Sequence, residues 1–168
     1  HLSGSLLVLE PGAYRIAVKD EFGFANREQV TYEIRVVPDR FPEVQISQPA
    51  ADMETTGDET LAVVYTAADD FGVNAVRLVY QLRGEEKRIT LKNEASARPG
   101  ERLASFGPRK FDWDLSALGL LPGEGVSFRI EAEDNDAISG PKRSSSRTIS
   151  LSMKDERGRA AREGADSQ

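Results

Sequence analysis

The stretch TLAVVYTAADDFGVNAVRLVYQL (residues 60–82) decides the fold class of this chain. Apolar residues recur at every second position on both sides of Asp70-Phe71-Gly72, which is the pattern of two half-buried strands. An Asp carboxylate accepts a backbone N–H two residues on, and Gly adopts positive φ without steric cost, so both residues favour a reversal. We therefore expect Asp70 to close a turn between two strands, with Gly72 at positive φ.

The same tripeptide holds magnesium in protein kinases, but only together with a Gly-rich loop, a strand Lys and a His-Arg-Asp loop. The single histidine of the chain is His1, and no stretch matches that Gly-rich loop before a V-A-I-K-like strand. The sequence therefore favours a structural turn over a kinase metal site.

Composition narrows the function classes. The 168 residues suit one domain of ordinary size and a fragment of another. A formal net charge of −6, with Lys and Arg interspersed among acids, argues against a nucleic-acid partner. The absence of cysteine excludes disulfides, thiolate zinc and a cysteine nucleophile. No apolar run approaches the roughly 20 residues that span a bilayer.

A repeat organises the chain. LEPGAYRIAVKDEFG (residues 9–23) aligns with LLPGEGVSFRIEAEDND (residues 120–136), so that Tyr14 falls on Phe128 and Asp20 on Asp134, an offset of 114 residues. An alternating segment follows each copy. We therefore predict two copies of one domain, the first without its front half. The expected parts are residues 1–38 as the C-terminal part of a repeat, residues 39–153 as a complete repeat, and residues 154–168 as a polar tail that is disordered or starts a helix.

Seven segments of the complete copy carry one apolar face at period two. They are residues 43–47, 60–68, 73–82, 87–93, 110–115, 126–134 and 147–153. Short alternating strands separated by turn residues predict two antiparallel sheets packed face to face. The expected fold is therefore all-β, an Ig-like antiparallel β-sandwich of about seven strands, preceded by the closing strands of a second such repeat.

The motifs P-x-V-x-I-x-x-P, A-x-D-D-F-G-V-x-x-V-x-L-x-Y, F-x-W-D-L and F-R-I-E-A-E-D-N-D occur in this order. This order resembles bacterial Ig-like repeat domains, most closely those of large bacterial membrane-anchored proteins of unknown function. The resemblance covers nearly all of the second copy and the end of the first. It implies spacers or docking modules outside the cytoplasmic membrane, followed by long helical segments, with which the tail KDERGRAAREGADSQ is compatible.

Five acids are the candidate metal ligands. Asp69 and Asp70 follow one predicted strand, Asp134 and Asp136 follow another, and Asp39 lies in the linker VVPDRFP. In an Ig-like sandwich these positions share a pole, where cadherin-like modules bind Ca²⁺ through oxygen ligands. Turn chemistry alone also explains each Asp, and the linker holds one acid where cadherin linkers carry several. We favour the turn interpretation, with no metal and no cofactor.

No catalytic residues are expected. Ser144, Ser145 and Ser146 lack a usable His partner, and Glu131 and Glu133 are expected on one exposed, solvated strand face. Trp113, a candidate for sugar stacking, alternates in phase with apolar neighbours and is expected in the core.

The sequence thus predicts a non-catalytic, extracytoplasmic Ig-like spacer or protein-interaction module of a larger bacterial envelope protein. Two alternatives stay open, a Ca²⁺-rigidified cadherin-like adhesion repeat and a carbohydrate-binding module. The expected partners are neighbouring Ig-like repeats and other domains of the same chain, with another envelope protein as a further candidate. Neither nucleic acid nor a membrane span within this stretch is expected, and the parent protein is expected to be membrane-anchored, in the periplasm or at the cell surface.

Overall fold

The computed structural model describes residues 3–28, 30–93 and 106–154. The chain divides into two compact units, unit 1 with residues 1–38 and unit 2 with residues 39–168. Apart from Lys154, the expected polar tail lies outside the described residues. Among the helices of the described residues, none is long and apolar enough to cross a membrane.

Unit 1 contains an antiparallel pair of strands, β1 (Gly12–Arg15) and β2 (Thr31–Ile34). Tyr14 lies opposite Tyr32, and their rings stack with centroids 5.1 Å apart. Cross-strand aromatic pairs of this kind stabilise a hairpin, although two strands alone remain marginally stable in water.

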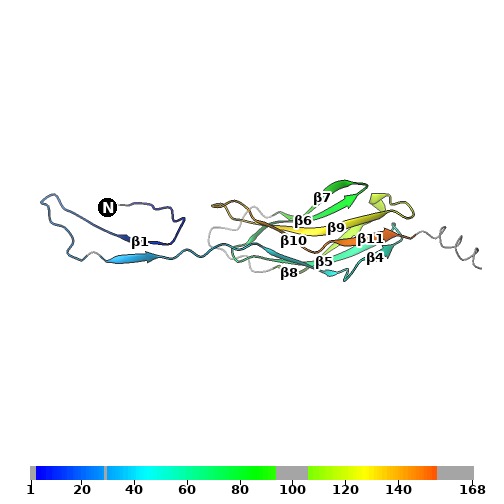
Figure 1. Ribbon diagram of the computed structural model, residues 1–168, viewed down its shortest axis with the longest axis horizontal. Helices are drawn as coiled ribbons and strands as arrows, with labels where there is room; N and C mark the ends of the chain where they lie inside the picture. The colour runs from blue at the N-terminus through cyan, green and yellow to red at the C-terminus, as the bar shows by residue number, and fades with distance from the viewer. Residues whose placement is uncertain (1–2, 29, 94–105, 155–168) are drawn as a thin grey trace, which may run out of the picture. The chain divides into compact units, whose positions relative to one another are not determined.

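Unit 2 is a sandwich of two sheets (Figure 1). The first sheet has the order β3-β5-β8, with bounds Glu43–Gln48, Thr60–Ala68 and Phe106–Asp114. The second has the order β4-β11-β9-β6-β7, with bounds Met53–Thr55, Ile149–Met153, Gly125–Asp134, Val73–Leu82 and Glu85–Asn93. The short strand β10 (Arg143–Ser145) pairs with β9, and a 3₁₀ turn (Ser116–Leu118) follows β8.

The predicted fold class is confirmed. The seven expected strands correspond to β3, β5, β6, β7, β8, β9 and β11, and two three-residue strands, β4 and β10, accompany them. All pairings in unit 2 are antiparallel except that of β4 with β11. The chain therefore changes sheets between β3 and β4, which brings β4 to the edge of the second sheet.

The core lies between the two sheets. Trp113 on β8 is 3% exposed, and its ring centroid lies 5.3 Å from those of Tyr80 and Phe128 on the opposite sheet. The fully buried side chains include Val63, Leu78, Leu115, Phe128, Ile130, Ile149 and Leu151. The indole is thus a core residue, as expected, and offers no exposed platform for the carbohydrate-binding alternative.

The outer face of the second sheet carries a network of ion pairs. Its pairs join Glu86 to Arg129, Arg129 to Glu131, Arg77 to Glu133 and Arg143 to Glu133. Val79 on β6 lies opposite Arg88 of β7 and Arg129 of β9 in the register, and its side chain is fully buried. The expectation of a solvated face for Glu131 and Glu133 was wrong, because the cross-strand register places Arg side chains beside them and leaves their side chains 16% and 10% exposed.

The two units repeat one local structure. β1 corresponds to β9 at an offset of 114 residues and β2 to β11 at an offset of 117, and the two pairs have the same register. The paired residues are Gly12 with Ile34 and Tyr14 with Tyr32 in unit 1, and Val126 with Leu151 and Phe128 with Ile149 in unit 2. The repeat seen in the sequence is therefore also a repeat of strand pairing.

Truncation of the core indole tests this packing. We expect Trp113→Ala to lower the free energy of unfolding by about 3 to 5 kcal/mol, because the indole bridges both sheets and leaves a cavity. Urea unfolding measures the change, with Leu121→Ala as control, since Leu121 is 60% exposed and should change stability by about 0.5 kcal/mol at most. Equal midpoints for the two variants would contradict this packing.

Candidate functional site

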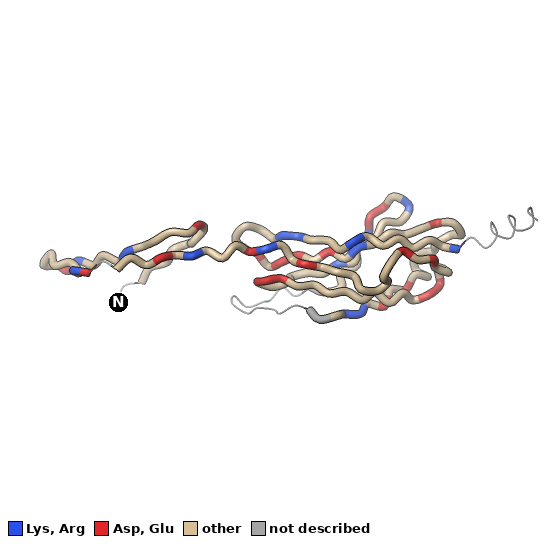
Figure 2. Tube along the Cα trace, turned by 60° about the horizontal axis from the view of Figure 1, so that its bottom comes forward, with Lys and Arg blue, Asp and Glu red and all other residues tan. Residues whose placement is uncertain are grey.

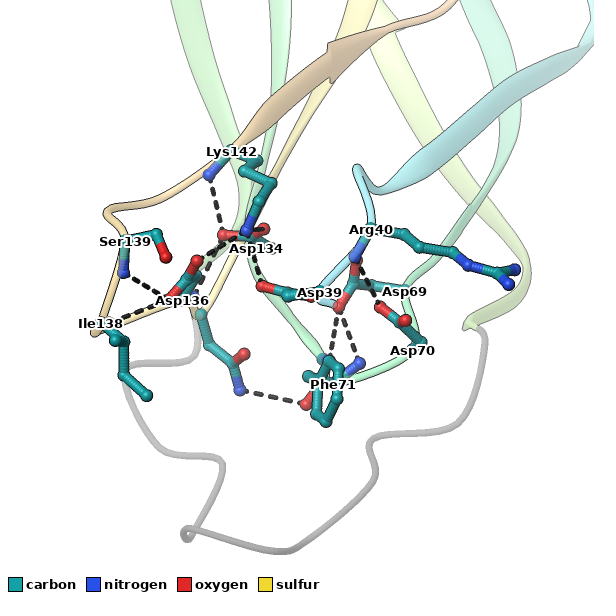
Figure 3. A network of polar contacts seen from close by, with 12 residues as sticks. Asp39, Arg40, Asp69, Asp70, Phe71, Asp134, Asp136, Ile138, Ser139 and Lys142 are labelled. Carbon is teal, nitrogen blue, oxygen red and sulfur yellow. Dashed lines mark hydrogen bonds and ion pairs between the residues drawn. The ribbon is translucent and has the colours of Figure 1, made fainter. Parts of the chain in front are cut away.

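The five candidate acids gather at one end of unit 2, which we call the amino pole because Asp39 begins the unit there (Figure 3). Asp69 and Asp70 come from the loop after β5, and Asp134 and Asp136 from the end of β9 and the loop beyond it. The two loops are joined directly. The Asn135 backbone N–H donates to the Gly72 carbonyl, and its side-chain amide donates to the Phe71 carbonyl, both at 3.1 Å.

Lys142 occupies the centre of the amino pole (Figure 3). Its ammonium donates to Asp136 Oδ2 at 2.6 Å and to Asp39 Oδ2 at 2.8 Å, and it lies 3.7 Å from Asp134 Oδ2. The Asp134 side chain is fully buried, and that of Asp136 is 7% exposed. One ammonium thus neutralises part of the charge of three carboxylates that solvent reaches poorly.

Hydrogen bonds favour the charged forms of Lys142 and Asp136. The bonds from the ammonium to Asp136 and then to Asp39 raise the pKa of Lys142 above its usual range. The bond from Lys142, followed by the backbone N–H groups of Ser139 and Ile138, lowers the pKa of Asp136. Burial raises the pKa of Asp39 and outweighs the opposing effect of Lys142. Asp39 therefore accepts a proton more readily than Asp136 does.

Asp134 serves the backbone of its loop. Its Oδ1 accepts the N–H groups of Asp136 and Lys142 at 3.1 and 2.8 Å. The equivalent Asp20 of unit 1 accepts the N–H groups of Phe22 and Phe24 at 3.0 and 2.8 Å. Both Asp side chains accept the N–H two residues on, and the loop closes at Phe24 in unit 1 but only at Lys142 in unit 2. The turn interpretation accounts for one oxygen of Asp134.

The turn after β5 differs from the expectation in one residue. Asp69, and not Asp70, closes it, because Asp69 Oδ2 accepts the N–H groups of Phe71 and Gly72 at 2.9 and 2.7 Å. Asp70 Oδ1 instead accepts the backbone N–H of Arg40 at 3.4 Å. Gly72 has φ of 132°, as expected for a position that penalises a Cβ.

Three of the candidate acids have the geometry of metal ligands. One carboxylate oxygen from each of Asp39, Asp69 and Asp70 lies within 4.8 Å of the others. Oδ1 of Asp39 and Oδ1 of Asp69 are buried and accept no hydrogen bond. Oxygen atoms of this kind suit a hard cation such as Ca²⁺, which takes six to eight oxygen ligands. The structure thus brings Asp39, Asp69 and Asp70 together, while Asp134 and Asp136 face Lys142.

Glu133, one of the two carboxylates paired on β9, is held in its charged form by two arginines, which does not suit a general acid. Glu133 accepts hydrogen bonds from Arg77 at 3.1 Å and Arg143 at 2.7 Å. Burial alone raises the pKa of Glu133, but the bonds from Arg77 and Arg143 together hold it below the usual value. Figure 2 shows Lys and Arg scattered among Asp and Glu along unit 2, without a basic stripe over the described residues.

Lys142 is the member of this site that sequence reasoning missed. It lies six residues after Asp136, in the segment DNDAISGPK. In the sequence, the only indication of this role is a lysine at the end of a loop that begins with two acids and contains Gly-Pro. That signal is weak, because a lysine in a loop is usually solvated.

No family model and no curated protein matches the chain. Similar solved structures include fibronectin(III)-like modules of Clostridium thermocellum CbhA, with 16% identity, a TM-score of 0.38, and coverage of 85% of this chain and 63% of that chain. A Ca²⁺-stabilized adhesin of an Antarctic bacterium that binds ice has 15% identity, a TM-score of 0.38, and coverage of 86% and 32%. An immunoglobulin-like domain of the M. primoryensis ice-binding adhesin has 16% identity, a TM-score of 0.33, and coverage of 67% and 95%. The chain spans less than two thirds of the first two structures.

Substitutions in the turn after β5 test the assignment of its residues. We expect Gly72→Val to destabilise unit 2 by about 1 to 3 kcal/mol, because a β-branched residue at positive φ is strained. Asp70→Asn should change stability little, because its carboxylate accepts only a long hydrogen bond, from the Arg40 N–H, among the described residues. Thermal or urea unfolding of both variants measures the effects. A larger loss for Asp70→Asn than for Gly72→Val would contradict the assignment.

Removal of the central ammonium tests the amino pole. We expect Lys142→Met to be less stable than the wild type at pH 7, because three poorly solvated carboxylates lose their cation. A raised Lys142 pKa means that this contribution is present below its usual value of 10.5 and is lost at higher pH. The lowered Asp136 pKa means that its contribution is present above its usual value of 3.8 and is lost as the pH falls.

The difference between wild type and Lys142→Met should therefore shrink as the pH is lowered from 7 to below about 4. Urea midpoints at a series of pH values measure it. Lys87→Met is the matched control, because Lys87 is 53% exposed and lies 3.8 Å from Glu85. A loss that does not depend on pH would indicate packing of the lysine stem, and would contradict the electrostatic account.

Proposed function

We propose that this chain is part of a non-catalytic, extracytoplasmic spacer in a larger bacterial envelope protein, in which Ig-like repeats follow one another. The observation that carries the proposal is the position of the two chain ends of unit 2 (Figure 1). Asp39 lies at the amino pole, and β11 ends at the opposite pole, where Met153 donates its N–H to the Glu124 carbonyl at 2.8 Å. A repeat with ends at opposite poles lengthens a tandem array.

Both chain ends are fastened to the sandwich. At the amino pole Lys142 holds Asp39. At the other pole the Lys154 N–H donates to the Thr55 carbonyl at 3.1 Å, and Glu124 pairs with Arg83 at 2.7 Å. The bond from Arg83, followed by the N–H of Leu121, lowers the Glu124 pKa to about 2, so the pair persists at neutral pH. Fastened ends support a role in which the unit holds its neighbours at a fixed spacing.

The surfaces of unit 2 also support a spacer over a specific binding module. The outer face of the second sheet satisfies its charges internally through the Arg and Glu pairs described above. The four exposed large apolar residues of unit 2 in the described part of the chain lie outside the strands and are Phe41, Phe71, Leu121 and Ile138. Single exposed apolar residues of this kind are common on monomeric proteins and do not mark an interface.

A domain exchange in the parent protein tests the spacer role. Residues 39–154 are replaced by an unrelated β-sandwich of similar length whose chain ends also lie at opposite poles. We expect the exchanged protein to retain the function of the parent, because a spacer contributes length and not a particular surface. Deletion of residues 39–154 is the control and should impair it. An exchange as harmful as the deletion would show that unit 2 presents a specific binding surface.

The extracytoplasmic location is the second part of the proposal, and the resemblance to envelope Ig-like repeats supports it. A tagged parent protein in its native host should be cut by added protease in intact cells or after the outer layer is opened. A cytoplasmic marker protein serves as control. Resistance of the tagged protein until the inner membrane is lysed would contradict the proposed location.

A Ca²⁺-rigidified repeat is the second candidate function, favoured by the oxygens of Asp39, Asp69 and Asp70 within 4.8 Å of one another. Lys142 already lies beside Asp39 and repels a second cation, so we expect no binding at physiological concentrations. The melting temperature of the full chain should be equal in millimolar Ca²⁺ and in chelator. A rise in Ca²⁺ that Asp70→Asn abolishes would establish the second candidate, because a ligand bound only to the folded state raises stability.

A further inference from the structure

Unit 1 exposes an unusual amount of apolar surface. Of the 16 exposed large hydrophobic residues in the described chain, 12 lie in unit 1. They are Leu6, Leu7, Val8, Leu9, Tyr14, Ile16, Val18, Phe22, Phe24, Val30, Tyr32 and Val37. A concentration of apolar side chains of this kind marks a surface that another protein segment covers.

The exposed residues of the hairpin form one face. Tyr14, Ile16 and Val18 alternate along the chain, and Tyr32 stacks on Tyr14 from the neighbouring strand. We call these four residues the apolar face of unit 1. Ile16, Ala17 and Val18 follow the end of β1, whereas their equivalents Ile130, Glu131 and Ala132 lie within β9, where side chains alternate between the two faces. The hairpin is therefore amphipathic, as a sheet with one buried face is.

The equivalent residues of unit 2 show what covers such a face. Tyr14, Ile16, Val18 and Tyr32 correspond to Phe128, Ile130, Ala132 and Ile149, which are at most 1% exposed. These four belong to the core cluster together with Leu61, Val63 and Trp113 of the facing sheet β3-β5-β8. Side chains at equivalent positions of the same strand register are therefore buried in unit 2 and exposed in unit 1.

The strand edges differ in the same way. In unit 2, β9 pairs with β11 on one edge and with β6 on the other. In unit 1, β1 pairs with β2, and within the described residues no second strand pairs with it. An unpaired edge beside an uncovered apolar face is a template for a further strand.

We propose that the apolar face of unit 1 and the free edge of β1 form the docking surface for the front half of an Ig-like repeat. The occupant is the segment of the parent chain that precedes unit 1, and it supplies strands equivalent to β3, β5, β6 and β8. The chain order of unit 2 supports this source, because its front half, residues 39–119, precedes β9. The inference concerns unit 1 and does not depend on the spacer role of unit 2.

A second copy of this chain fits the surface less well. Two hairpins packed face to face would cover each other's apolar faces, but each β1 would keep an unpaired edge. The front half of a repeat supplies both the facing sheet and the strand beside β1, as β5 and β6 do in unit 2. Only that occupant satisfies the backbone groups of the edge as well as the apolar side chains.

The test compares the chain of 168 residues with the same chain extended at its amino end by the preceding segment of the parent, as long as residues 39–119. Hydrogen exchange of the β1 and β2 amides is measured at several protein concentrations. We expect these amides to exchange about 100-fold more slowly, or slower still, in the extended chain, because burial in a sandwich protects them from local opening. The extended chain should also remain monomeric.

Two variants of the extended chain make the test specific. Ile16→Asp places a carboxylate on the apolar face and should abolish the gained protection. Ala17→Glu is the matched control on the opposite side, where the equivalent position of unit 2 carries Glu131, and should keep it. The comparison uses the exchange rates of the β1 and β2 amides. The amides of unit 2 in the same sample serve as an internal reference, because their exchange should not change.

Three results would overturn the proposal. The first is equal protection in the two chains. The second is protection of the shorter chain that rises with concentration and disappears with Ile16→Asp, since this would identify a second copy as the occupant. The third is a preceding segment of the parent that lacks alternating strands.

Discussion

The packing of two apolar sheet faces against each other is the constraint on which the rest of unit 2 depends. Side chains alternate along each strand, so one face of every strand enters the core and fixes which residues remain outside. Trp113 and Phe128 meet across this interface with centroids 5.3 Å apart. Because the sheets are fixed in this way, loops distant in the sequence meet at the poles, and Asp39 reaches Lys142.

The amino pole shows how a lysine of the same chain stabilises neighbouring acids. A lysine tethered to the loop after β9 supplies the positive charge, and its hydrogen bonds reach Asp136 and Asp39. A tethered ammonium is present at any concentration of free cations, whereas a bound Ca²⁺ stabilises only where its concentration exceeds the dissociation constant. The adjacent oxygens of Asp39 and Asp69 remain without hydrogen bonds, which is a local cost of gathering acids at one end of the sandwich.

The two units share local structure but differ in the burial of equivalent side chains. The hairpin of unit 1 has the register of β9 and β11, and Asp20, like Asp134 in unit 2, accepts the N–H two residues on. Ile16 is nevertheless 54% exposed, while its equivalent Ile130 is fully buried. Strand formation therefore follows from local alternation and turn chemistry, whereas burial requires the opposite sheet. Most of the stability of a sandwich comes from that burial.

The sequence by itself determined the seven longer strands of unit 2, the repeat and the positive φ of Gly72, because alternation and turn chemistry are local properties. The three-residue strands β4 and β10 were not predicted. The core position of Trp113 also followed from its phase with neighbouring apolar residues. Tertiary structure alone decided which of two adjacent carboxylates closes the turn, since Asp69 and Asp70 have the same side-chain chemistry and accept different backbone N–H groups. It also decided the pairing of Glu133 with Arg77 and the position of Lys142, because cross-strand register and the reach of a long side chain are not encoded in sequence spacing.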